Sequence, residues 1–250
     1  MASIFDRDEL NESLFYPRGD TSDVPDGATD LFVDVDDARL HVRIHAADAA
    51  RCTLLLFHGN GEVVADYDRT AAEFADAGAR LAVADYRGYG ESIGTPTLRA
   101  AIADARPIAD AVRAATRAPL VVMGRSLGGA PAHELYAKPI DGMIGVVLES
   151  AFFELAGLIE RRGMRPPARY APDELAVFDP ATKLRRGTLP LLILHGADDT
   201  LVSPDDARSA HAAAGGTNTQ LAMIADRGHN DVSAEPAYWD ALAAFIARVA

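Results

Sequence analysis

A short apolar run that ends in a glycine-flanked serine is the feature that most constrains this chain. Residues 120–129 read LVVMGRSLGG, and helical sequence follows directly. The apolar, β-branched start predicts a buried strand, and the G-x-S-x-G pattern predicts a sharp strand-to-helix turn with Ser126 at its apex. A side chain at Gly124 or Gly128 would collide with the adjacent strand and helix. Such a turn exposes the serine hydroxyl and brings the backbone N–H of Leu127 to a helix N-terminus, where negative charge is stabilised.

From residue 52 onward, apolar strands alternate with alanine-rich helical stretches, which is typical of βαβ units and a parallel sheet. We expect strands at 52–58, 79–85, 119–124, 142–149, 189–195 and 219–225. We expect helices at 63–77, 97–116, 127–138, 204–214 and 235–249. The fold class is therefore α/β, with a mostly parallel central sheet and helices on both faces.

The remaining segments depart from this alternation. Residues 1–30 are polar and contain prolines and glycines, which predicts an irregular lead-in. Apolar and polar residues alternate over 31–35 and 39–45, which predicts an antiparallel hairpin at a sheet edge. Residues 151–188 interrupt the pattern with Pro and Gly and predict a short lid or insertion. A length of 250 residues suits a single domain over 1–250.

Composition excludes several classes of function. The net charge is −13, which argues against partners such as nucleic acid or an anionic membrane surface. No apolar run approaches ~20 residues, so we expect no membrane span. The N-terminus lacks the apolar core of a signal peptide, which predicts a cytoplasmic protein. Cys52 is the only cysteine and lies in an apolar strand, so it is interpreted as a small buried hydrophobe. The sequence does not indicate the oligomeric state.

Four loops at the expected carboxyl ends of strands carry reactive or glycine-rich sequence. Ligands of open parallel sheets bind at this edge. These loops read HGNGE at 58–62, GRSLGG at 124–129, HGADDT at 195–200 and DRGHND at 226–231. Together they place a nucleophile, a carboxylate, an imidazole and a flexible amide-donor loop on one rim.

The chemistry of these residues predicts a catalytic triad. The hydroxyl of Ser126 needs an adjacent base, and His229 is the candidate. The base in turn needs a carboxylate that fixes its tautomer, for which Asp199 is preferred and Asp198 is the rival. The backbone N–H groups of Asn60 and Leu127 would form an oxyanion hole. The chain has no H-E-x-x-H or comparable spacing, so neither a metal nor another cofactor is expected.

Several other residues have two open interpretations. His58 and His195 each precede a glycine at a strand end, where shaping a loop is favoured over acting as a base. Tyr86, in the loop DYRGYGES at 85–92, either contacts substrate or has a structural role. Phe152 and Phe153, with Leu155 and Leu158, are candidates for the acyl side of the pocket or for core packing. The short 151–188 segment predicts a fairly open pocket.

These motifs together resemble the α/β-hydrolase fold serine hydrolases, and most of all the Bem46-like group. The resemblance rests on the five loops at 58–61, 85–92, 124–129, 195–199 and 228–231 and extends from residue 15 to the last helix. It implies that Ser126 is the nucleophile, Asp199 the acid and His229 the base, with Asn60 and Leu127 in the oxyanion hole. In this family the acid follows His-Gly-x-x, which selects Asp199. VSP at 202–204 differs slightly from the family pattern.

The sequence therefore predicts a serine hydrolase that works through an acyl-enzyme. The expected substrate is a small-molecule ester or thioester with a small to medium acyl group. An amidase or peptidase of the same fold is the alternative, because the triad does not distinguish them. A catalytically idle binding scaffold, a perhydrolase and a carbon–carbon hydrolase are further alternatives. A nucleophilic aspartate is disfavoured because Ser126 occupies the turn.

Overall fold

A computed structural model describes residues 3–215 and 218–250. Its strands form one eight-stranded sheet in the order β1-β2-β4-β3-β5-β6-β7-β8. The strands are β1 (Thr29–Val35), β2 (Ala38–Ile44), β3 (Cys52–Phe57), β4 (Ala79–Ala84), β5 (Leu120–Arg125), β6 (Met143–Glu149), β7 (Leu191–Gly196) and β8 (Thr219–Ile224). The antiparallel pairs are β1–β2 and β2–β4, and the others are parallel. The expected α/β fold and the hairpin at the sheet edge are confirmed.

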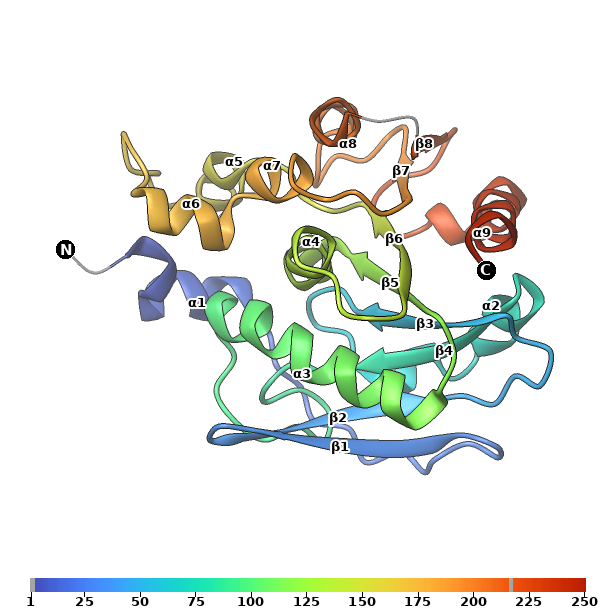
Figure 1. Cartoon of the computed structure of the whole chain (residues 1–250). Helices are drawn as coiled ribbons and strands as arrows, with labels where there is room; N and C mark the ends of the chain where they lie inside the picture. The colour runs from blue at the N-terminus through green and yellow to red at the C-terminus, as the bar shows by residue number, and fades with distance from the viewer. Residues whose placement is uncertain (1–2, 216–217) are drawn as a thin grey trace.

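Helices cover both faces of the sheet (Figure 1). The α-helices are α1 (Asp8–Leu14), α2 (Ala71–Asp76), α3 (Leu98–Thr116), α4 (Gly129–Ala137), α5 (Leu155–Glu160), α6 (Pro172–Phe178), α7 (Pro180–Leu184), α8 (Pro204–Ala214) and α9 (Pro236–Val249). Short 3₁₀ turns are η1 (Ile4–Asp6), η2 (Val64–Tyr67), η3 (Ser126–Gly128) and η4 (Val232–Ala234). Helices α3, α4 and α8 pack on one face, and α2 and α9 pack on the other.

Alternation along the central strands fills two apolar cores. In β3, Leu55 and Phe57 pack beneath α3 and α4, whereas Leu54 and Leu56 face α2 and α9. Successive side chains of a strand point to opposite faces, so a strand covered on both sides is apolar throughout. This double burial explains why β3, buried at every position, is almost entirely apolar.

Part of the lead-in, residues 4–14, differs from the prediction of an irregular segment, whereas residues 15–28 have no helix, as expected. Residues 4–14 contain η1 and α1, and Phe5 and Leu10 are fully buried. The side chain of Asn11 donates to the carbonyl of Phe5 at 3.1 Å and accepts from the N–H of Leu98 at 2.8 Å. These contacts join α1 to the start of α3. Residues 4–14 are helical because of tertiary burial, which their polar local sequence does not reveal.

Two expected helices are divided, and the 151–188 segment has its own short helices. The helix expected at 63–77 consists of η2 and α2, and the one expected at 127–138 consists of η3 and α4. Residues 151–188 form α5, α6 and α7, of which α7 packs on α4 and α8. In Figure 1 the arrowheads of β3, β4 and β5 point toward the side where α5 and α6 lie, so this segment borders the carboxyl ends of the strands.

Candidate active site

Ser126 occupies the sharp turn between β5 and α4. Its φ of 50° is in the left-handed region, which L-residues rarely adopt and which marks local strain. A Cβ on Gly124 would overlap the backbone of Gly128, and a Cβ on Gly128 would overlap the carbonyl of Phe57. The two glycines therefore allow the turn to pack tightly against its own helix and against β3, as the sequence predicts.

His229 and Asp199 complete a hydrogen-bonded chain to this serine. His229 Nε2 lies 2.9 Å from Ser126 Oγ, and His229 Nδ1 lies 2.8 Å from Asp199 Oδ2. Asp199 follows β7 and is buried, whereas the neighbouring Asp198 is exposed. The structure thus brings Asp199, and not its rival, against the imidazole. This is the order of groups that a nucleophile, a base and an orienting carboxylate require.

Asp199 is held in its ionised form by its surroundings. Burial alone would raise the pKa of this carboxyl group, but hydrogen bonds from His229 and from backbone N–H groups lower it. Oδ1 accepts the backbone N–H groups of Leu201 and Val202, both at 2.8 Å. An ionised carboxylate in this position favours the Nδ1–H tautomer of His229 and leaves Nε2 free to accept the serine proton.

A cavity of about 70 Å³ opens beside Ser126. Its walls are Asn60, Ser126, Leu127, Phe152, Leu158, Arg161, Arg162, Leu201 and Val202. The residues expected in the oxyanion hole therefore border the same space as the serine hydroxyl. Phe152 and Leu158, two of the candidates for the acyl side of a pocket, supply apolar surface there.

The side chain of Asn60 serves the loop itself. Its Oδ1 accepts the backbone N–H of Tyr16 at 3.0 Å and the hydroxyl of Tyr89 at 2.7 Å. The carboxamide is therefore engaged by two donors from other segments. The group of Asn60 that suits an oxyanion is its backbone N–H, and the oxyanion-hole assignment stays a prediction.

Tyr86 and Phe153, two of the residues expected to contact substrate, are not among the residues that border this cavity. The Tyr86 hydroxyl donates to the carbonyl of His58 at 2.6 Å, and its ring packs edge-on against the imidazole. Phe153 is partly buried and packs against the core cluster. Of the two phenylalanines, Phe152 borders the cavity.

Arg125, the residue before Ser126, links three loops and was not singled out by sequence. Its guanidinium pairs with Glu62 at 2.5 Å and with Glu149 at 3.1 Å, and it donates to Asn230 Oδ1 at 2.9 Å. Burial raises the pKa of Glu149, although Arg125 and the Tyr238 hydroxyl oppose this. The sequence does show an arginine directly before the serine. It also shows an acidic residue in the loop after β3, Glu62, and another at the end of β6, Glu149.

Glu62 connects Arg125 to the loop at 58–62, which carries the candidate oxyanion-hole residue Asn60. Its Oε2 accepts the backbone N–H of Gly59 at 2.7 Å and the hydroxyl of Tyr67 at 2.6 Å. Asn60 follows Gly59 directly in the chain. The carboxylate of Glu62 therefore fixes the loop that presents the Asn60 N–H, while its other oxygen contacts Arg125.

A buried aspartate joins two histidines behind the same loop. Asp85 is fully buried, and its oxygens lie 3.2 Å from His58 Nε2 and 3.2 Å from His41 Nδ1. Its Oδ1 also accepts the N–H of Val64 at 3.1 Å. Burial alone would raise the pKa of Asp85, but these hydrogen bonds lower it. His58 is thus engaged in shaping the loop, which agrees with the interpretation favoured by its sequence.

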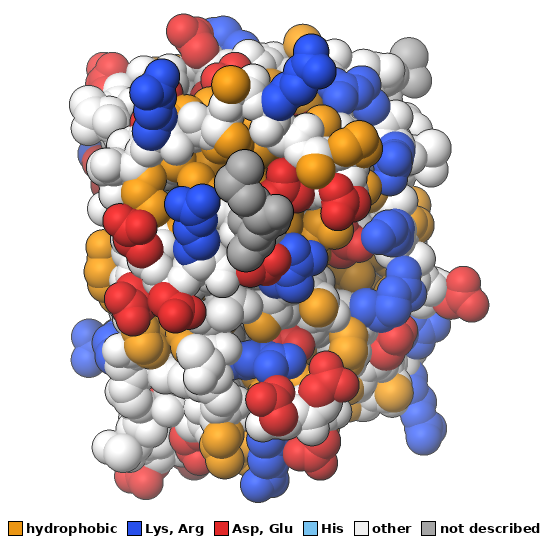
Figure 2. Space-filling view, turned by 90° about the vertical axis from the view of Figure 1, so that its left-hand side faces the viewer, with side chains coloured by type: hydrophobic (Ala, Val, Ile, Leu, Met, Phe, Trp, Pro, Cys, Tyr) orange, Lys and Arg blue, Asp and Glu red, His pale blue; other side chains and the backbone are white. Residues whose placement is uncertain are grey.

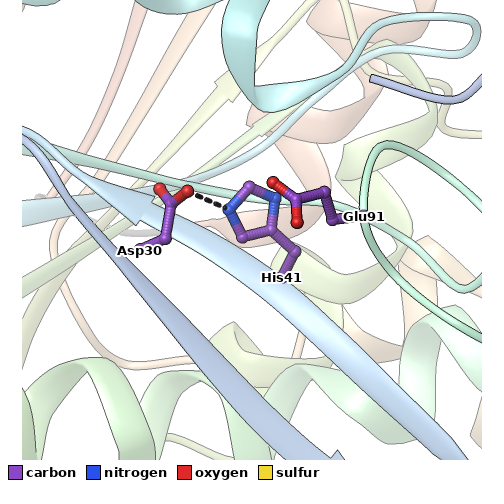
Figure 3. A group of neighbouring side chains, drawn as sticks. All are labelled: Asp30, His41 and Glu91. Carbon is purple, nitrogen blue, oxygen red and sulfur yellow. Dashed lines mark ion pairs between the residues drawn. The ribbon is translucent and has the colours of Figure 1, made fainter. Parts of the chain in front are cut away.

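Asp30, His41 and Glu91 carry ligand-type atoms within 4.8 Å of one another (Figure 3). His41 Nε2 lies 3.1 Å from Asp30 Oδ2. The guanidinium of Arg43, however, donates to both oxygens of Asp30, at 2.8 and 3.0 Å. It therefore occupies the carboxylate and would repel a cation. Burial opposes the charged form of His41, but Asp85 and Asp30 raise its pKa. We therefore assign the group as an ion-pair cluster.

Comparison with known proteins places this geometry in a family. Residues 48–184 match the Hydrolase_4 family, described as serine aminopeptidase, S33. Protein bem46 of Schizosaccharomyces pombe is 27% identical over 80% of this chain and 68% of its own length. Lysophosphatidylserine lipase ABHD12 of Macaca fascicularis is 28% identical over 63% of this chain and 44% of its own length. This chain thus spans about two thirds of Protein bem46 and less than half of ABHD12.

Solved structures show the same fold. The esterase Pf2001 of Pyrococcus furiosus has a TM-score of 0.74 at 14% identity, covering 94% of this chain and 98% of the esterase. Among the described residues, no helix combines the length and apolarity needed to cross a membrane. The family match covers more than half of the chain, so this protein belongs to the serine aminopeptidase S33 family of α/β-hydrolases and is a serine hydrolase similar to Protein bem46.

Proposed function

We propose that this serine hydrolase cleaves small-molecule carboxylic esters or thioesters with small to medium acyl groups, through an acyl-enzyme. The observation that carries the proposal is the hydrogen-bonded chain Ser126–His229–Asp199, with distances of 2.9 and 2.8 Å. A fold of this kind hosts many activities, so the argument for this one rests on the site.

In the proposed mechanism, Ser126 Oγ attacks the acyl carbonyl while His229 Nε2 accepts its proton. The tetrahedral oxyanion forms beside the backbone N–H groups of Asn60 and Leu127. As the intermediate collapses, His229 returns the proton to the departing alcohol or thiol. Water, deprotonated by His229, then hydrolyses the acyl-serine and restores the hydroxyl. Asp199 stabilises the imidazolium in both halves of the reaction.

The names of similar proteins support ester chemistry. ABHD12 is named a lysophosphatidylserine lipase and Pf2001 an esterase, and both cleave ester bonds by those names. The family description, serine aminopeptidase, favours a second candidate, the hydrolysis of amides. A panel that pairs p-nitrophenyl esters with the matching p-nitroanilides distinguishes the two, because both release a chromophore from the same acyl group.

The proposal is tested by fluorophosphonate labelling with intact-protein mass spectrometry, alongside p-nitrophenyl esters of rising chain length. We expect one adduct that is absent in Ser126→Ala, and turnover that falls by about 10⁴-fold or more in that variant. Asp199→Asn is expected to lower kcat by about 10⁴-fold. Asp198→Asn, one residue away and exposed, is the matched control and should retain wild-type rates. A folded protein with neither adduct nor turnover would contradict the proposal.

A further inference from the structure

The segment between α5 and α6 concentrates positive charge in an acidic protein. Residues 161–169 read RRGMRPPAR, with four arginines and no acidic residue, in a chain whose net charge is −13. Figure 2 views the molecule from the side toward which the strands β3, β4 and β5 point. Basic side chains are numerous along the upper and right-hand parts of this face. The face that carries the carboxyl ends of the strands is therefore not uniformly acidic.

Two of the four arginines border the cavity that contains Ser126. Arg161 and Arg162 form its rim together with Leu158 and Leu201, whereas Arg165 and Arg169 do not line it. Cationic side chains and the nucleophile thus share one small space. A substrate bound there places its reacting carbonyl at Ser126 and another of its groups near the arginines.

The backbone of α5 leaves room for the first of these side chains. A Cβ at Gly157 would come 3.1 Å from Arg161 Nη1, so the guanidinium lies directly over this glycine. Arg161 is exposed on its outer side. Its position against the helix keeps the guanidinium close to the cavity, where a longer side chain at 157 would displace it.

Neither guanidinium has an acidic partner within residues 3–215 and 218–250. No described carboxylate oxygen lies within 4.0 Å of either group. The Nε of Arg162 is shielded from solvent and has no hydrogen-bond acceptor among the described residues. Buried donors are normally satisfied, so an unpaired one beside a pocket calls for an acceptor. By contrast, Arg125, which directly precedes Ser126 in the chain, has two carboxylate partners.

We propose that Arg161 and Arg162 form a subsite for an anionic group, a carboxylate or a phosphate, carried by the ester substrate. The proposal rests on the proposed function, because the anion is bound while its ester reaches Ser126. A guanidinium presents a planar fork of donors that matches both kinds of oxyanion. The local arginines would also attract a charged substrate that the net charge of the protein would otherwise repel.

Two matched substrate pairs locate the charge on the substrate. The first pair is p-nitrophenyl hydrogen glutarate and p-nitrophenyl valerate, which share a five-carbon acyl chain and differ in a terminal carboxylate. The second pair is a 1-acylglycerol 3-phosphate and the 1-acylglycerol with the same acyl chain, which differ in a phosphate on the leaving group. A higher kcat/KM for the anionic member of the first pair assigns the anion to the acyl side of the substrate. A higher kcat/KM for the anionic member of the second pair assigns it to the alcohol side.

The double variant Arg161→Gln/Arg162→Gln tests the subsite. We expect kcat/KM for the anionic member of one pair to fall by about tenfold or more, because charge-assisted hydrogen bonds are lost. The neutral member should lose severalfold less than the anionic member, because it makes no charge-assisted hydrogen bond with the guanidinium groups. Arg165→Gln/Arg169→Gln removes the same charge from the same segment outside the cavity and is the matched control, which should retain the wild-type preference. Arg162→Lys keeps the charge but not the fork and should lose part of the preference.

Three results would overturn the subsite. One is a wild-type enzyme that does not prefer the anionic member of either pair. Another is an equal loss for anionic and neutral esters in the cavity variant, which indicates damage to the fold of the pocket. The third is an equal loss of kcat/KM for the anionic ester in the control variant, which indicates only long-range electrostatic attraction. Hydrolysis of the neutral esters and labelling of Ser126 report the proposed function separately. If these also fail, the proposed function and the subsite are both refuted.

Discussion

His133 is expected to make the fold sensitive to mild acid. It lies on α4, is 1% exposed and packs edge-on against Phe152. Burial, assisted by the positive charge of Lys183, lowers its pKa from 6.5 to about 3. Between these two values the unfolded chain binds a proton at this site and the folded chain does not. The free energy of unfolding therefore falls as the pH is lowered through this range.

The magnitude follows from the proton uptake of the unfolded chain. At pH 5 the solution is 1.5 pH units below the ordinary pKa of 6.5, and each unit is worth 1.36 kcal/mol, so His133 removes about 2 kcal/mol of stability. Since pH 5 is well above the pKa in the fold, proton binding by the folded protein contributes little. This is a sizeable part of the stability of an ordinary domain.

Urea unfolding at pH 7.5 and pH 5.0 checks this prediction. The wild type should lose about 2 kcal/mol more than His133→Leu between the two pH values, because a leucine of similar volume does not titrate. The other titratable groups are common to both proteins and cancel in the difference. His211→Gln is the control for removing a histidine outside the core. An equal pH dependence in the wild type and His133→Leu would refute the reasoning.

Three further predictions concern single residues. Glu62→Gln weakens the contact with Arg125, so kcat should fall by roughly tenfold while the melting temperature changes little. An unchanged kcat would argue against a role of Glu62 in holding the loop at 58–62. Gly128→Ala should destabilise the fold by roughly 3 kcal/mol in urea unfolding, because its Cβ overlaps a β3 carbonyl; wild-type stability would contradict this. Burial raises the pKa of Cys52 to about 11, so at pH 8 the folded protein should react far more slowly with a thiol reagent than the urea-unfolded protein, and equal rates would disprove it.

The parallel part of the fold could be predicted because its signals are local. The apolar runs of β3 to β8 have the length of strands, and glycine or helical sequence bounds each one. The N-terminal helix α1 could not be predicted in this way. Its seven residues are mostly polar, and it is stabilised by burying Leu10 and Leu14 against distant segments. A short helix with weak local preference depends on such tertiary contacts.

The candidate triad could be predicted because all three residues follow strand ends in loops that meet at one edge. The choice between Asp198 and Asp199 depends on which carboxylate turns inward, and the structure shows that Asp199 does. Tyr86 illustrates the opposite case. An aromatic residue in a glycine-rich loop gives no local indication of whether its hydroxyl faces substrate or, as here, the carbonyl of His58.

The network around Arg125 shows why some determinants of the site stay hidden in a single sequence. The residue before the serine is unrestricted in G-x-S-x-G, yet this arginine contacts Glu62, 63 residues away, and Asn230, 105 residues away. A largely buried guanidinium is tolerated only if acceptors surround it, and here two acceptors belong to different loops and the third, Glu149, ends β6. The loops therefore cannot shift independently without leaving a buried charge unpaired. The arrangement that brings the loop at 58–62 and the residue after the candidate base toward Ser126 is thus stabilised by polar and charged groups outside the candidate triad.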